Sequence, residues 1–491
     1  MAQKTFDLSW IKKHKSILLL SLFVGIGIYT RLSGTIHGFF AFTYDQGKDF
    51  LALDDIVNGR HLTLIGPTTG IDGVFHGVWW YWLLVPLFWI FKGDPVWLVA
   101  SFNLISAASI VLAFILGKEL VDERLGLILA GLMSVSPFYI STGAQLWHPN
   151  LVPLLMLLLL ISLVKYQKGR WPWFWVAAVL GAIFEFELAA GILFVPVFGL
   201  TLVLTRQLPK MKQLILGGAG FDFWLIPRLI FEMRHSWIQT YSLFKFLTHP
   251  TLVNQMSLLV RLSDRIQTIT NLLAYAFVNS NKLIGIILLI MIMAGGKEIS
   301  KQKTLRFLLV LICLLGINLV IYQGTLWEYY INMFPTLVLP LIGMGLYIFV
   351  KKYRIWGGVI ISSLLLYNLA PWRFFAKPWA GDASSYKNEI RVVETVYQRA
   401  SGKPFNVQVY SPSVIDYNYH YLFKWYGNKE YAFTADRDDE QATVFYIIEP
   451  DPWKTGRLRS WLAEREGDGQ LIWQQIFPGE IEVWEKLRVM N

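Results

Sequence analysis

The sequence contains a single cysteine, Cys313, and it lies inside an apolar run. One cysteine excludes an intramolecular disulfide and a thiolate metal site. The sequence also lacks the two common phosphate-binding glycine fingerprints, G-x-x-x-x-G-K-[ST] and G-x-G-x-x-G after a strand. Any soluble part must therefore fold without covalent cross-links, and nothing indicates a nucleotide-binding loop.

Charged residues are also few. They make up 16% of the 491 residues, whereas 55% are hydrophobic and 15% aromatic. The apolar residues gather in recurrent runs of roughly 15 to 24, close to the ~20 residues that cross a bilayer core. This pattern predicts a polytopic membrane protein.

The basic residues predict the orientation of the chain. Lys12, Lys13 and Lys15 precede the first apolar run, and no small-residue cleavage site follows it. We therefore expect an uncleaved first span at 17–34 and a cytoplasmic N-terminus in the cell membrane. All short basic loops then face the cytoplasm only if the apolar segment 78–91, which contains Pro86, is an interfacial helix and not a span.

This choice predicts an all-α membrane domain of about eleven transmembrane helices plus the interfacial helix, with the C-terminus outside the cell. The ten further spans are expected at 96–117, 124–141, 150–165, 172–186, 190–205, 213–231, 277–294, 306–323, 330–350 and 355–371.

The last part of the chain has a different composition. Apolar runs stop after residue 375, and the segments in 376–491 alternate between helical and strand periodicity. We expect a transmembrane domain at 1–375, with a first outer loop at 35–95, and a small extracytoplasmic α/β domain at 376–491. The net charge of +10 comes from the short loops between spans, which argues against nucleic acid as a partner.

The predicted topology brings ionisable groups to one outer face of the membrane. Such groups are costly at membrane depth unless they line a cavity, so their convergence indicates a functional site. Asp45 in "TYDQGKD" follows the first span directly. It can act as a general base toward a hydroxyl or hold a metal, and the plain alternative is an ordinary polar loop or a helix cap.

Two further groups of residues stand out on this face. Asp72 and His76 in "IDGVFHG" are four residues apart, and they suit a divalent cation or, through His76, a phosphate, unless His76 only caps the next helix. In "PRLIFEMRH", Arg234 and His235 suit phosphate oxygens or merely reach lipid headgroups. Arg228 lies deeper and needs a partner.

The partner expected for Arg228 is one of two carboxylates in "FEFE", Glu185 or Glu187. An arginine two helical turns inside an apolar segment is stable only when it is paired. We therefore expect a structural intramembrane pair, separate from the phosphate-binding residues.

Taken together and in order, these motifs resemble the C-type membrane glycosyltransferase superfamily, and most of all its bacterial protein O-mannosyltransferase and aminoarabinose-transferase branch. The resemblance covers residues 10 to about 350 and includes the acidic residue after the first span, the "FHG" step into an aromatic helix, "WHPN", "FEMRH" and "YY" before the tenth span.

The resemblance implies an inverting transfer of a sugar from a polyprenyl-phosphate donor to a hydroxyl of a lipid, glycan or protein acceptor, outside the cell membrane. Asp45 would be the catalytic base, and Arg234, His235, His76 and Lys48 would bind the donor phosphate. A divalent cation at Asp72 and His76 stays open, because Gln46 stands where many relatives carry glutamate and "QLWHPN" lacks their aspartate.

Two other classes of function compete with this interpretation. A transporter or flippase would use broken helices and inverted repeats around a midplane site, and no internal repeat is visible. A non-catalytic assembly or receptor protein would use the C-terminal domain to bind a partner. Neither the sugar nor the acceptor follows from the sequence.

Overall fold

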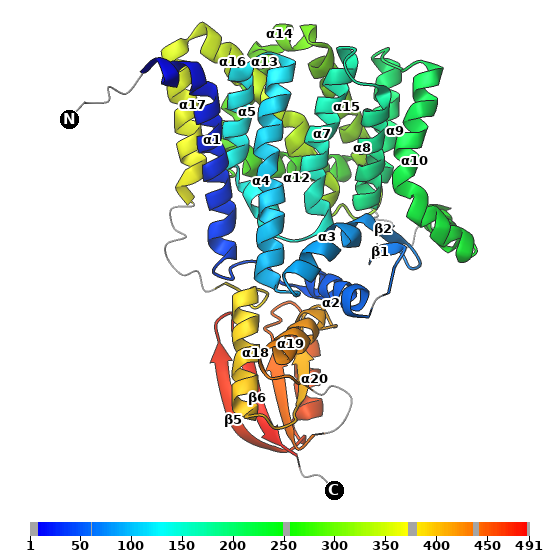
Figure 1. Ribbon diagram of the computed structural model, residues 1–491, viewed down its shortest axis with the longest axis vertical. Helices are drawn as coiled ribbons and strands as arrows, with labels where there is room; N and C mark the ends of the chain where they lie inside the picture. Colours follow the sequence, from blue (N-terminus) through cyan, green and yellow to red (C-terminus); the bar gives the residue numbers. More distant parts are fainter. Residues whose placement is uncertain (1–7, 60, 249–255, 372–380, 436–440, 489–491) are drawn as a thin grey trace, which may run out of the picture.

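The computed structural model describes residues 8–59, 61–248, 256–371, 381–435 and 441–488. A bundle of long helices forms one end of the molecule and a small mixed domain forms the other (Figure 1). The helices in the first part of the chain, up to α9, are α1 (Leu8–Thr35), α2 (Tyr44–Asn58), α3 (Trp79–Ile90), α4 (Pro95–Leu120), α5 (Glu123–Val135), α6 (Pro137–Ala144), η1 (His148–Leu151), α7 (Val152–Gln167), α8 (Trp173–Phe186) and α9 (Leu188–Leu204).

The second half of the bundle begins after the basic loop at 205–210. It contains α10 (Met211–Arg234), α11 (Ile238–Thr248), α12 (Leu258–Val278), α13 (Lys282–Ala294), α14 (Gly296–Lys301), α15 (Lys303–Ile321), η2 (Glu328–Ile331), α16 (Phe334–Lys352) and α17 (Arg354–Leu369).

Six helices among the described residues are long and apolar enough to cross a membrane, or up to eight if two bent pairs each form one span. The expected eleven spans require three shorter apolar helices, α8, α9 and α17, to cross as well. Large apolar side chains on the outside of the bundle are exposed, as lipid-facing residues would be, among them Ile215, Leu283 and Ile355.

Two of the expected spans are not single straight helices. The segment 124–141 forms α5 and α6, which meet at 57° because Ser136 is held extended before Pro137. The expected span 277–294 starts later, at Lys282. A helix that we did not expect, α12, precedes it at an angle of 91°, and left-handed Asn279 ends that helix.

The segment between α1 and α4, expected to be the first outer loop, forms a compact layer between the bundle and the small domain, made of α2, a hairpin and α3 (Figure 1). The hairpin pairs β1 (Ile65–Thr68) with β2 (Phe75–Gly77) in antiparallel register. The segment expected to be interfacial forms α3, a helix of 12 residues with Pro86 inside it. A helix this short lies below the length that spans a bilayer.

The C-terminal domain is a four-stranded mixed sheet with helices, as the periodicity predicts. The strand order is β3-β4-β6-β5, with β3 parallel to β4 and the other pairs antiparallel. The expected domain boundary at 375/376 lies outside the described residues. The elements are α18 (Tyr386–Ala400), β3 (Asn406–Tyr410), α19 (Tyr417–Glu430), β4 (Thr443–Ile448), α20 (Thr455–Arg465), β5 (Gln470–Phe477) and β6 (Ile481–Leu487).

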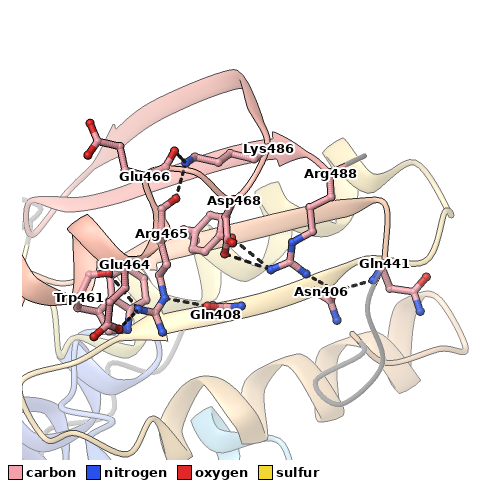
Figure 2. A network of polar contacts seen from close by, with 11 residues as sticks. Asn406, Gln408, Gln441, Trp461, Glu464, Arg465, Glu466, Asp468, Lys486 and Arg488 are labelled. Carbon is pink, nitrogen blue, oxygen red and sulfur yellow. Dashed lines mark hydrogen bonds and ion pairs between the residues drawn. The ribbon is translucent and has the colours of Figure 1, made fainter. Parts of the chain in front are cut away.

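A polar network ties α20 to the strands of this sheet (Figure 2). Arg465 at the end of α20 donates to Gln408 on β3 at 2.8 Å. Lys486 on β6 donates to the Arg465 carbonyl at 2.7 Å, and Arg488 forms an ion pair with Asp468 at 3.4 Å. These contacts stabilise the end of the sheet that lies far from the membrane helices.

The domain packs directly on the first outer loop. Phe42 donates its backbone N–H to the Ser384 carbonyl at 2.9 Å, and Tyr386 donates to the Phe40 carbonyl at 3.0 Å. Tyr421 on α19 donates to the Gly93 carbonyl at 2.5 Å. The interface therefore holds the segments before α2 and after α3.

Candidate active site

The candidate site is a cavity of about 850 Å³ where α2, the β1–β2 hairpin, the α6–η1 connection and η2 meet. The segments that form it are far apart in the sequence, and most of them come from the polar outer loops. Its wall includes Tyr44, Asp45, Lys48, Asp49, His76, His148 and Tyr329.

Asp45 lies in the first turn of α2 and is exposed to the cavity. Thr43 precedes the helix, and its N–H and hydroxyl both donate to Gln46 Oε1, at 3.0 and 2.6 Å. Gln46 Nε2 donates to the Leu146 carbonyl at 3.2 Å. Gln46 thus fixes the start of the helix through these hydrogen bonds, and none of them involves the Asp45 carboxylate.

The environment of Asp45 raises the pKa of its carboxyl above the ordinary value. Partial burial is the main cause, and the nearby His148 and Lys48 act in the opposite direction. A carboxylate with a raised pKa is a stronger proton acceptor than a surface aspartate, which suits a general base.

Asp49 is a second carboxylate on the same wall, one turn after Asp45, and we did not single it out from the sequence. It is buried and accepts hydrogen bonds from Trp80 Nε1 at 2.8 Å and from Tyr81 OH at 3.1 Å. Burial raises the pKa of Asp49 to about 6, against the hydrogen bonds and the charge of His148. The i, i+4 spacing of Asp45 and Asp49 is the signal that would have revealed it.

Lys48 lies in the cavity, as expected for a donor-phosphate contact, although that role stays a prediction. Its Nζ donates to Thr68 Oγ1 at 2.5 Å. The ammonium also lies 5.8 Å from the ring centroid of Tyr44 and 5.9 Å from that of Tyr417. Tyr417 belongs to α19, so the C-terminal domain contributes a side chain beside the cavity mouth.

His76 lies in β2 and is buried, whereas Asp72 is exposed in the turn of the hairpin. Asp72 is not among the residues that line the cavity. The His76 ring packs instead against His148, with centroids 4.1 Å apart. Burial, with the charges of His148 and Arg228, holds the pKa of His76 well below its ordinary value, so this imidazole is neutral.

Arg228 forms an ion pair with Glu185, one of the two expected partners. Its Nε is 2.6 Å from Glu185 Oε1, and Glu185 is buried. Arg228 Nη1 also donates to the Phe75 carbonyl at 3.0 Å and to Gln239 Oε1 at 2.9 Å. The arginine therefore holds the hairpin that carries His76, in addition to neutralising Glu185.

Glu187 has a different neighbour from the expected one. Its Oε2 lies 3.2 Å from His148 Nδ1, and both side chains are buried. The break between α8 and α9 falls at Glu187, which turns its side chain toward η1 and away from Arg228. His148, Glu187 and His76 place their ligand atoms within 4.8 Å of one another, and among the described residues they form the one group of this kind.

Arg234 and His235 lie apart from the other residues expected to bind the donor phosphate. They end α10, are exposed, and do not line the cavity. His235 Nδ1 lies 2.8 Å from the Phe231 carbonyl, and its ring stacks on the Phe231 ring. Because α10 continues past Arg228, it carries the last two basic residues to the outer surface, where they suit lipid headgroups better than the donor phosphate.

A smaller cavity of about 160 Å³ adjoins the main one, and both are bordered by His76 and Tyr329. Its other walls come mainly from apolar side chains of α9 and α11, including Leu188, Ile192, Leu193, Leu243 and Phe246. The main cavity is polar around Asp45, so the two together offer a polar chamber next to an apolar one.

No family model matches the sequence, and the search among curated proteins found no match. Solved structures are similar in fold. ArnT from Cupriavidus metallidurans, bound to undecaprenyl phosphate, superposes with a TM-score of 0.61 over 99% of this chain and 100% of that one, at 9% identity. This chain has the C-type glycosyltransferase fold.

The apo structure of the same ArnT gives a TM-score of 0.64 over 98% of this chain and 100% of ArnT, at 10% identity. The oligosaccharyltransferase from Archaeoglobus fulgidus covers 88% of this chain and 62% of its own, with a TM-score of 0.48 at 14% identity. The similarity to ArnT extends over both the helical bundle and the C-terminal domain, whereas the sequences have diverged almost completely.

Proposed function

We propose that the protein transfers a sugar from a polyprenyl-phosphate donor to an acceptor hydroxyl, with inversion at the anomeric carbon, on the extracytoplasmic side of the cell membrane. The observation that carries the proposal is the position of Asp45, which is exposed in a polar cavity that opens into an apolar one. The C-type fold supports the same reaction class.

The two cavities suit the two parts of such a donor. The first isoprene units fit between α9 and α11, because the cavity walls there come mainly from apolar side chains. The phosphate then lies near His76 and Tyr329 at the junction, and the sugar extends toward Asp45. Lys48 is the cation in this wall that can compensate the leaving phosphate.

In the proposed step, Asp45 accepts the proton of the acceptor hydroxyl. The hydroxyl oxygen attacks the anomeric carbon from the face opposite the phosphate, and the bond between that carbon and the phosphate oxygen breaks. Polyprenyl phosphate leaves with the bonding electrons, so the configuration inverts and no oxidant or reductant is needed. Exposure of Asp45 leaves room for the acceptor, whereas buried Asp49 has none.

The extracytoplasmic location rests on the positive-inside pattern of the loops. A phosphatase fused after Asn491 should be active if the C-terminus is outside. Activity of a cytoplasmic reporter at the same position would instead reverse the side of the site, and it would count against α3 as an interfacial helix.

Reconstitution tests the chemistry. Purified protein in liposomes, supplied with radiolabelled undecaprenyl-phosphate sugars and a membrane extract as acceptor, should transfer label, and Asp45→Asn should not. Mass spectrometry of surface lipids and glycans from cells with and without the protein then identifies the sugar. Movement of the labelled lipid between leaflets without any transfer would overturn the proposal in favour of a flippase.

A further inference from the structure

The proposed transfer places the phosphate near His76, and it gives no role to the buried group that His76 forms with His148 and Glu187. Each residue comes from a different segment: His76 from the hairpin, His148 from η1 and Glu187 from the α8–α9 break. All three are buried, with 8%, 5% and 0% of their surface exposed. Burying two imidazoles and a carboxylate together is costly unless something compensates them.

Hydrogen bonds within the described structure do not satisfy Glu187. Neither of its carboxylate oxygens accepts one. His148 Nδ1 is 3.2 Å from Glu187 Oε2, but it lies closer, at 2.9 Å, to the Phe186 carbonyl. The hydrogen bond of His148 Nδ1 thus goes to a backbone oxygen, and the buried Glu187 carboxylate has an ion-pair contact with this histidine but no hydrogen bond to it.

The arrangement matches the donor set of a transition-metal ion. Two imidazoles and one carboxylate are typical zinc ligands, each ~2.0–2.2 Å from the metal in known sites. The ligand atoms here lie within 4.8 Å of one another, a spacing at which the three residues could hold one ion. The Phe186 carbonyl near His148 Nδ1 is the kind of outer partner that orients a metal-bound histidine.

The cavities leave a coordination position open. His76 and His148 border the main cavity, and His76 and Glu187 border the apolar one. A zinc site with three protein ligands and a fourth position open to solvent or substrate is the common form of non-structural sites. Asp45 and Asp72 are not part of the group.

We propose that His76, His148 and Glu187 together bind one divalent transition-metal ion of the zinc class. The ion would neutralise Glu187 and link the hairpin, η1 and the α8–α9 break. The site differs from the sequence-based expectation, which paired His76 with Asp72.

Metal analysis of the full-length protein tests the proposal without any activity assay. Protein purified in detergent, dialysed with zinc and then freed of loose metal should retain one zinc ion per chain by mass spectrometry. Glu187→Gln keeps the shape of the side chain and removes its charge, and His148→Ala removes an imidazole. Both should bind zinc at least about a hundredfold more weakly, since even outer-shell changes cost roughly 10- to 100-fold.

His61→Ala is the matched control, because His61 is exposed and lies outside the group. This variant should keep the zinc of the wild type. If His148→Ala fails to fold, the effect of zinc on the melting temperatures of Glu187→Gln and the wild type tests the proposal instead. Zinc should raise the melting temperature of the wild type and not that of Glu187→Gln.

Cobalt provides a second measurement. Cobalt-loaded wild type should show the visible absorption of a four- or five-coordinate ion with nitrogen and oxygen ligands, and Glu187→Gln should lack it. Wild-type protein that retains no zinc, shows no stabilisation and gives no cobalt spectrum would overturn the proposal. Zinc retained equally by Glu187→Gln and His148→Ala would overturn it as well.

Discussion

Gly47 on α2 lies in direct backbone contact with Asn418 on α19. A side chain at Gly47 would overlap the Asn418 N and Cα atoms and the Tyr417 carbonyl carbon. Gly47 is two residues from Asp45, so the helix that carries the proposed base is packed on the first turn of a C-terminal domain helix. Only glycine permits this approach.

Gly47→Ala should therefore separate the two helices and displace Asp45. Overpacking of this kind typically costs about 1–3 kcal/mol, so we expect a lower melting temperature together with a loss of transfer. Gly358→Ala on α17 is the control, because nothing lies within 4 Å of an added Cβ there. If Gly47→Ala retained full stability and activity, the C-terminal domain would not position α2.

Asp45→Asn should abolish most of the transfer activity without harming the fold. Asparagine keeps the size of the side chain but accepts no proton, and loss of a general base costs about 10² to 10⁴ in rate. The measurement is the turnover of a labelled donor in liposomes, with melting temperature as the check on folding.

Asp55→Asn is the control for this change, since Asp55 is on the same helix, is exposed and forms its ion pair with the exposed His61. Asp54 is less suitable, because it forms an ion pair with Lys424 of the C-terminal domain at 2.5 Å. Equal rates for Asp45→Asn and wild type would move the base to another residue of the cavity.

The pH profile of transfer should reflect the raised pKa of Asp45. The base works only when it is deprotonated, so kcat/KM should fall as the pH drops through a value above that of an ordinary aspartate. His148 and Lys48 hold this pKa down. Lys48→Ala should therefore shift the acidic limb of the pH profile to higher pH. An unchanged acidic limb would show that the group whose titration limits kcat/KM is not Asp45.

Much of this arrangement was predictable from the sequence. Apolar runs and basic loops predict the membrane helices and their order, and short apolar segments such as 443–448 predict buried strands of the sheet. Asp45, Lys48 and His76 were expected at one site and line one cavity. Local signals suffice for these features, because each depends on its own few residues.

The rest depends on contacts between distant segments. The bend at 135–137 and the helix α12 interrupt what reads as simple spans. Glu185 and Glu187 are equivalent in the sequence, and only the break at the end of α8 directs one to Arg228 and the other to His148. The sequence also does not show that Arg234, at the end of α10, lies outside the cavity.

Asp49 makes the stability of the protein depend on pH. Its pKa is about 6 in the folded protein, above the value of 3.8 for an unperturbed aspartate. Between these values the folded state binds more protons than the unfolded state, so the free energy of unfolding should decrease as the pH rises from about 4 to about 6.

Asp49→Asn should remove this dependence, although it also loses one of the hydrogen bonds from Trp80 and Tyr81. Thermal unfolding in detergent at a series of pH values measures it. A wild-type melting temperature that falls no more steeply than that of Asp49→Asn over this range would contradict the burial of an ionisable group at this position.

Arg228 and Arg234 lie on one helix, six residues apart, and should respond to mutation in opposite ways. Arg228→Ala leaves the buried Glu185 without its cation and frees the hairpin at Phe75, and breaking a buried pair typically costs about 3–5 kcal/mol. The variant should express poorly or melt early. Arg234→Ala removes an exposed charge outside the cavity, so its melting temperature and its rate with the lipid donor should both stay near those of the wild type.

Replacing Glu185 together with Arg228, as Glu185→Gln with Arg228→Met, should recover part of the stability, because no charge is then left buried without a partner. Loss of donor binding in Arg234→Ala at unchanged stability would restore the sequence-based assignment of the phosphate to the end of α10.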